Sequence, residues 1–227
     1  MVTIIPAAGK AKRFGYSQKT LLEINKKSLL SRLLTKTDGR KILIVNEQNK
    51  DLFRSYSSEI QIWSNGAQNF NSVRGCLYDI MDCLVELNVR DDICIICADL
   101  LFSFSLDSCI QKGTDQRRIC IPIKKGTPDE MQMAGSVCVD SSGTVSDFAE
   151  HRVLDNSNFT QLGIYFIPKH LLYLIEECYH LDSPGYLIEY AFNLFPVCTD
   201  IVDGFWFHIN TKEDYEKARD MVAYINI

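Results

Sequence analysis

An excess of positive charge is missing from this sequence. Its 227 residues carry 24 Lys and Arg against 29 Asp and Glu, which gives a formal net charge of -5. A general nucleic-acid-binding protein neutralises phosphates with clustered Lys and Arg. The composition therefore argues against nucleic acid as a partner.

Long apolar runs, internal repeats and flexible linkers are also absent. Only a few apolar residues precede Lys10, so we expect no signal peptide, no membrane span and a cytoplasmic protein. The nine cysteines are irregularly spaced and mostly lie in apolar runs, as small buried hydrophobes do, which favours a reducing compartment. A hydrophobic content of 46% suffices for a sizeable core, and predicts one domain over residues 1–227.

What the sequence does contain is a regular alternation of short Val- and Ile-rich runs with helix-like stretches over its first hundred residues. This pattern predicts the α/β class, with a Rossmann-like, mostly parallel mixed sheet flanked by helices. After residue 100 the pattern changes to strand-like runs separated by polar loops, which predicts small β elements that supply specificity. The expected strands are 2–6, 41–45, 60–63, 92–97, 118–123, 132–139 and 160–167. The expected helices are 72–87 with Ser72 as its cap, 169–179, 185–194 and 211–224, opened by a capping box of Asn210 and Glu213.

Small residues and then cations follow the first expected strand. Residues 7–9 read Ala-Ala-Gly and allow a ligand to approach the backbone N–H groups at the carboxyl end of a parallel strand. The cations that follow supply the charge that a triphosphate requires, namely Lys10, Lys12, Arg13 and Lys19. The alternative is a solvated basic turn, and composition alone leaves both open.

These residues resemble the opening signature of the nucleotidyltransferase superfamily, A-A-G-x-G-x-R followed by P-K-x-L-L. That superfamily includes sugar-phosphate nucleotidyltransferases, methylerythritol-phosphate cytidylyltransferase and phosphocholine cytidylyltransferases. The resemblance implies that a loop with Ala7, Ala8 and Gly9 wraps a triphosphate. It also implies that Arg13 binds the outer phosphates and that Lys19 neutralises charge at the reacting phosphorus. The chain departs from the signature at two positions, with Ala11 for the second Gly and Gln18 for the Pro.

A second segment, residues 65–73, resembles the G-G-A-x-R-x-x-S-V stretch of the cytidylyltransferase branch. The resemblance implies that Gly66, Ala67 and Ser72 contact cytosine, so CTP is the expected nucleotide. Asn69 stands in place of the Arg of that stretch. An ordinary loop with a helix cap explains Gly66 and Ser72 equally well.

Metal chemistry is expected at the end of the apolar run 93–98, where Asp99 stands at the carboxyl edge of the sheet. The resemblance implies that Asp99 binds Mg²⁺, although it could simply cap a turn. Residues 205–215 resemble the family's W-x-D-I-D-T-P-E-D-L, with His208 and Asn210 at the acidic positions. Because Mg²⁺ prefers oxygen, Asn210 is the easier ligand, and His208 contacts either the metal or a phosphate. Asp203 could replace them from nearby.

The resemblance also implies a small phosphorylated acceptor whose phosphate attacks the nucleotide without a covalent enzyme intermediate. Residues 161–165 and 148–151 resemble the acceptor-flanking N-x-G-I-Y and F-x-E-K segments. Lys124 and Lys125 could meet the acceptor phosphate, or form a solvated pair. We expect His151, His170 and His180 to lie on the surface without a role.

Several alternatives remain open. They are a sugar-1-phosphate nucleotidyltransferase that uses another NTP, and a non-catalytic nucleotide-sensing domain, which Ala11, Gln18 and His208 suggest. A guanylyltransferase acting on a molybdenum cofactor fits less well, because that branch opens with A-G-G. A dinucleotide-dependent oxidoreductase would need G-x-G-x-x-G, which the chain lacks after its first strand. A homodimer also remains open.

Overall fold

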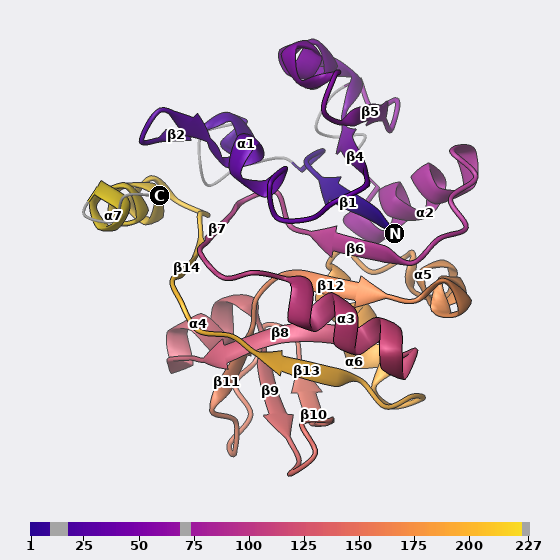
Figure 1. The fold of residues 1–227 in the computed structure, drawn as a ribbon, viewed down its shortest axis with the longest axis vertical. Coiled ribbons are helices and arrows are strands. Elements are labelled where there is room, and N and C mark those ends of the chain that lie inside the picture. Colours follow the sequence, from indigo (N-terminus) through magenta and orange to yellow (C-terminus); the bar gives the residue numbers. More distant parts are fainter. Residues whose placement is uncertain (10–17, 69–73, 224–227) are drawn as a thin grey trace.

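The computed structural model describes residues 1–9, 18–68 and 74–223. One large mixed sheet runs through it in the order β10-β9-β11-β8-β12-β6-β1-β4-β5, with β13 added beside β8 (Figure 1). Helices cover both faces of this sheet. The predicted α/β class is confirmed.

The first half of the chain forms the parallel part of the sheet. Its strands are β1 (Val2–Pro6), β4 (Arg40–Val45), β5 (Gln61–Ser64) and β6 (Ile93–Ile96), and they pair in parallel. A parallel strand covered on both faces needs a continuous apolar run, and every residue of β6 is indeed buried. The four strands lie within one residue or so of their predicted bounds.

The second half is mainly antiparallel. It contains β8 (Cys120–Lys125), β9 (Ser136–Val139), β10 (Val145–Ala149), β11 (Phe159–Gln161) and β12 (Ile164–Ile167). Only β13 (Cys198–Ile201) lies parallel to its neighbour, β8. Pairing of β12 with β6 joins the two halves into one sheet.

Two predicted strands of this half are wrong in their bounds. Residues 132–139 do not form one strand, because a capping box of Thr127 and Glu130 starts α4 (Pro128–Ala134), which runs until Gly135. Gly135 has φ 130°, a conformation that Gly adopts most readily, and β9 follows it. Residues 160–167 form two strands, separated at Gly163 with φ 72°.

The helices lie in two layers. Figure 1 shows α2 (Cys76–Glu86), α5 (Tyr173–Cys178) and α6 (Pro184–Ala191) behind the sheet and α3 (Asp107–Gln116) in front of it. The remaining elements are shorter or peripheral: η2 (Lys19–Leu21), β2 (Glu23–Ile24), β3 (Lys27–Ser28), α1 (Leu29–Leu33), η3 (Glu47–Tyr56), β7 (Leu100–Phe102), η5 (Lys169–Leu171), β14 (Trp206–His208) and α7 (Lys212–Ala223). The predicted helix 169–179 is therefore divided into η5 and α5.

Two predicted caps differ from the structure. Helix α2 has Gly75 as its N-cap, with φ 126°, whereas Ser72 lies outside the described residues. At the start of α7 the reciprocal bonds join Thr211 and Asp214: the Asp214 backbone N donates to Thr211 Oγ1 at 3.1 Å, and Asp214 Oδ2 accepts from the Thr211 backbone N at 2.8 Å. The Asn210 side chain, predicted as the cap, is thereby left for another contact.

Within the described ranges, no helix combines the length and apolar character that crossing a membrane would require. All nine cysteines carry free thiols.

Candidate active site

A cavity of about 280 Å³ opens at the carboxyl edge of the parallel strands. Pro6, Ala7 and Gly9 line it from the end of β1, and residues 97–99 line it from the end of β6. Ligands bind open α/β sheets at this edge. A larger apolar groove of about 530 Å³ lies between α2 and α5, and none of the predicted site residues lines it.

Four side chains predicted to act on phosphates or metal meet beside this cavity. Lys19 Nζ donates to Asp99 Oδ2 at 2.6 Å and to Asn210 Oδ1 at 3.2 Å. His208 Nε2 lies 3.3 Å from Asp99 Oδ1. The four residues are separated by up to 191 positions in the chain, so only the fold brings them together.

The pairing of β14 with β7 explains this convergence. The two short strands align antiparallel, which places His208 opposite Leu100, directly after Asp99. The backbone N of Ile209 then donates to the Asp99 carbonyl O at 2.9 Å. Buried Trp206 secures the strand by donating from Nε1 to the Leu162 carbonyl O at 3.0 Å. Backbone pairing thus holds the late segment against the end of β6.

The side chains of His208 and Lys19 determine the ionisation of Asp99. Burial alone would raise the pKa of its carboxyl, but His208 and Lys19 outweigh that effect and hold the pKa well below its ordinary value. The carboxylate, 21% exposed, is thus ionised at neutral pH, with Lys19 at one oxygen and His208 at the other. A phosphate that attracted Lys19 away would free one of these oxygens.

The donor set around Asp99 fits Mg²⁺ only with help from a substrate. Asp99 and Asn210 present carboxylate and amide oxygens, the ligand type that Mg²⁺ prefers. Among the described residues, however, no group of three or more His, Cys, Asp or Glu side chains could hold a metal ion. Nucleotide phosphates and water would have to complete the coordination. His208 Nδ1 is buried, and the described chain offers it no hydrogen-bond partner.

Two of the predicted base-binding residues, Gly66 and Ala67, lie in a loop after β5. The backbone N of Glu47 donates to the Ala67 carbonyl O at 3.1 Å, so this loop lies against the end of β4 at the same edge as the cavity. Gly66 has φ 72°, and nothing approaches the position that a Cβ would occupy. Ala67 is buried.

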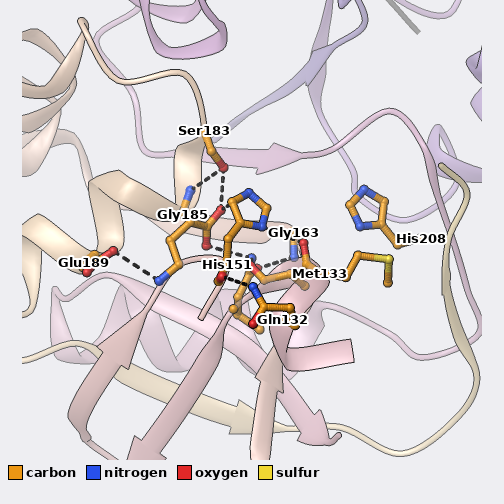
Figure 2. A network of polar contacts seen from close by, with 12 residues as sticks. Gln132, Met133, His151, Gly163, Ser183, Gly185, Glu189 and His208 are labelled. Atoms are coloured by element: carbon orange, nitrogen blue, oxygen red, sulfur yellow. Dashed lines mark hydrogen bonds and ion pairs between the residues drawn. The ribbon is translucent and has the colours of Figure 1, made fainter. Parts of the chain in front are cut away.

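A second polar network lies on the other side of the cavity (Figure 2). His151, in a left-handed conformation with φ 53°, lines the cavity, and its Nδ1 lies 2.7 Å from the Met133 carbonyl O. Its Nε2 lies 3.5 Å from Glu150 Oε1. Because a carbonyl can only accept, Nδ1 carries a proton in this contact. His151 is therefore held in one orientation at the cavity wall.

Glu150 lies at the centre of this network and is 1% exposed. Its carboxyl accepts from Ser183 Oγ at 2.6 Å and from Gln161 Nε2 at 3.2 Å. Burial raises the pKa of the Glu150 carboxyl, against the opposing effects of Ser183 and His151. A Cβ at Gly185 would overlap the carboxylate, so only glycine lets α6 approach this closely.

Several predicted residues lie elsewhere or cannot be placed. Arg13 and Ser72 fall outside the described residues. Ala8 is buried in the core and does not line the cavity. Lys124 lies 3.9 Å from Glu130, and neither Lys124 nor Lys125 lines the cavity.

Sequence reasoning missed part of the cavity wall. Cys76, Cys97 and residues 182–184 also line it, and they belong to the start of α2, the end of β6 and the start of α6. His151 is exposed, as predicted, and its side chain also lines the cavity. The F-x-E-K resemblance at residues 148–151 was the available signal.

Comparison with known proteins connects this geometry to a family. A curated glucose-1-phosphate adenylyltransferase of Thermomicrobium roseum is 25% identical over 134 residues, which is 56% of this chain and 31% of that protein. The chain therefore spans about a third of that relative's length.

Solved structures match nearly the whole fold at low sequence identity. UTP-bound UGPase from Acinetobacter baumannii has a TM-score of 0.77 at 15% identity, covering 99% of this chain and 94% of that one. The inositol-1-phosphate CTP transferase from T. maritima has a TM-score of 0.74 at 19% identity, covering 98% and 94%. The model of the nucleotidyl transferase family matches residues 3–218. With the cavity at the carboxyl edge and almost the entire chain matched, this protein belongs to the nucleotidyl transferase family.

Proposed function

We propose that this protein transfers CMP from CTP to the phosphate of a small phosphorylated metabolite and releases pyrophosphate. The convergence of Lys19, Asp99 and Asn210 beside the small residues that follow β1 carries the proposal. The choice of CTP rests on the base loop, in which Gly66 and Ala67 follow the cytidylyltransferase pattern. The solved relatives use different nucleotides: one is described as a CTP transferase and another as UTP-bound.

In the proposed mechanism, an acceptor phosphate oxygen attacks the α-phosphorus in line as pyrophosphate leaves. The acceptor phosphate is already anionic at neutral pH, so the residues need only position the two anions and neutralise their charge. Lys19 would leave Asp99 for the phosphates, with Arg13 on the outer phosphates. When bound, Mg²⁺ would be held by Asp99 and Asn210 and would neutralise phosphate charge, with His208 as a further ligand or a phosphate contact.

The acceptor would lie on the opposite side of the cavity, against His151 and the start of α6. Ser183 caps this helix, which presents backbone N–H groups and the positive end of its dipole. This arrangement favours an anionic or hydroxyl-rich group. Candidate acceptors are phosphocholine or another phosphorylated amine or amide, a polyol phosphate and a sugar phosphate. We propose that the described chain acts as one domain in the cytoplasm, as a monomer or a homodimer.

The proposal is tested by pyrophosphate release with Mg²⁺, each of the four NTPs and a pool of phosphorylated metabolites. CTP-dependent release that Asp99→Ala abolishes is the expected result. Release with UTP, ATP or dTTP in preference to CTP would retain nucleotidyl transfer but overturn the choice of nucleotide.

A non-catalytic nucleotide-sensing domain is the second candidate. The observation that favours it is the pairing of Asp99 with Lys19 and with His208, which stands at a position where the family has an acidic residue. Tight CTP binding without pyrophosphate release under any acceptor would establish this alternative.

A further inference from the structure

A buried carboxyl group outside the cavity is hydrogen-bonded to the loop expected to hold the nucleobase. We define the base loop as residues 64–67. Asn65 occupies its centre, and the Asn65 backbone N donates to the Val45 carbonyl O at 2.9 Å, which anchors the loop to β4. The Asn65 side chain then makes two further bonds. Its Oδ1 accepts from the Ala67 backbone N at 3.0 Å, and its Nδ2 donates to Asp79 Oδ2 at 2.8 Å.

Asp79 comes from a different element, the first turn of α2, and is only 2% exposed. Its Oδ2 receives the Asn65 bond, whereas its Oδ1 is buried with no hydrogen-bond partner in the described chain. Burial raises the pKa of this carboxyl. A buried carboxyl oxygen without a partner costs free energy, so the fold retains Asp79 here at the expense of stability.

The chemistry of the two side chains explains what Asp79 does. In the observed contact Asp79 Oδ2 is the acceptor, whereas the Asn65 amide has one accepting and one donating end. Asp79 therefore forces Asn65 to turn Nδ2 toward α2 and Oδ1 toward the Ala67 N–H. If the amide were flipped, two acceptors would face each other and Nδ2 would meet the Ala67 donor. In this orientation the bond from the Ala67 N–H to Asn65 Oδ1 spans the exposed Gly66.

We propose that Asp79 is a positioning residue for nucleobase recognition, acting through Asn65 on Gly66 and Ala67. The inference rests on the proposed function, in that the base loop must meet the base. Asp79 itself touches no substrate. Its contribution should appear as nucleotide affinity and discrimination among bases, and leave turnover at saturating nucleotide unchanged.

Asp79→Asn is the informative variant, because it is almost isosteric but gives position 79 a donor and so permits the flipped Asn65. We expect the dissociation constant for the preferred NTP, measured calorimetrically without acceptor, to rise about five- to tenfold, the effect of losing one hydrogen bond. Discrimination against the other three NTPs should fall by a similar factor while kcat at saturation stays unchanged. Glu86→Gln, which removes one exposed negative charge from the same helix, should alter none of these values.

A double-mutant cycle separates positioning from general damage to α2. In an Asn65→Ala background the hydrogen bond between Asp79 and the base loop is absent, so Asp79→Asn should have no further effect on nucleotide binding. An undiminished effect there, or unchanged discrimination in Asp79→Asn alone, would overturn the inference. If the wild-type chain binds none of the four NTPs, the proposed function fails and this inference fails with it. If the wild-type protein discriminates among the four NTPs and Asp79→Asn discriminates equally well, the proposed function stands and only the inference about Asp79 fails.

Discussion

Two carboxyl groups on opposite sides of the cavity show how differently its two halves are built. Asp99, on the parallel side, contacts His208 and Lys19, and these two side chains lower the pKa of its carboxyl. Glu150, on the antiparallel side, is fully buried, accepts hydrogen bonds from Ser183 and Gln161, and has a raised pKa. The Asp99 carboxylate contacts side chains that a polyanionic substrate can attract away. The Glu150 carboxyl is held by packing and by hydrogen bonds that a substrate leaves intact.

This difference indicates that the two sides of the cavity have different roles. The parallel side can rearrange when phosphates bind, because Lys19 Nζ contacts the mobile ends of other side chains, those of Asp99 and Asn210, and is partly exposed. The antiparallel side is preorganised, since the Glu150 network lies beneath His151 and joins β10, β11 and α6. Variants on the parallel side should therefore change chemistry, and those on the antiparallel side should change stability or acceptor binding.

The largest effect is expected from removing charge on the parallel side. Lys19→Ala should lower the rate of pyrophosphate release roughly 100-fold or more, because a preorganised charge at the reacting phosphates is lost. Lys125→Ala removes an exposed lysine that does not line the cavity, and should leave the rate unchanged. A steady-state rate for Lys19→Ala within a factor of three of wild type would contradict the assigned role.

On the antiparallel side, Gly185→Ala should act mainly through stability. The added methyl group would overlap the Glu150 carboxylate, and such overpacking typically costs about 1–3 kcal/mol. Denaturant unfolding should show this loss. Adding Glu150→Ala should remove part of it, because the clash then has no partner. Strictly additive losses in the double variant would show that the overlap is relieved in some other way.

The two halves of the sheet also differ in how well the sequence predicts them. The parallel strands were predictable because strands such as β6, buried on both faces, read as continuous apolar runs. In the antiparallel half, the boundaries depend on Gly135 and Gly163, whose positive φ angles end α4 and separate β11 from β12. A Gly in an apolar stretch does not reveal whether it ends a helix or breaks a strand. The predicted strand 132–139 was wrong for this reason.

The site shows the same contrast. Lys19 and Asp99 could be proposed from motifs because each directly follows a recognisable loop or strand. The surroundings of His151 could not be predicted, since Ser183 and Gly185 reach Glu150 from more than 30 positions away in the chain. The base loop was expected at residues 66 and 67, but its link to Asp79 depends on how α2 packs.

A smaller effect is expected at the cavity wall of the antiparallel half. His151→Ala should raise the KM for the acceptor about tenfold, the effect of one lost charged or polar contact, and leave the KM for the nucleotide unchanged. Steady-state kinetics with each substrate varied in turn measures the two constants. His170→Ala, at an exposed site on η5 outside the cavity, serves as the matched control. Equal changes in both KM values would indicate that the two sides of the cavity are not independent.

The smallest expected effect is also the most direct test of the contrast between Asp99 and Glu150. Folding lowers the pKa of Asp99, so its stabilising contribution is present above its unfolded pKa of about 3.9 and is lost as pH falls below that value. Folding raises the pKa of Glu150. Its contribution is therefore complete below its unfolded pKa of about 4.3 and is lost as pH rises through the folded pKa. Unfolding free energies measured against pH in metal-free buffer should lose their acid slope in Asp99→Asn, whereas Glu150→Gln should lose the decline above pH 4.3. The comparison uses the slope of unfolding free energy against pH, so a pH-independent loss of stability caused by either substitution does not affect it. If the two substitutions changed this slope in the same direction, the environments of the two carboxyls would not differ as proposed.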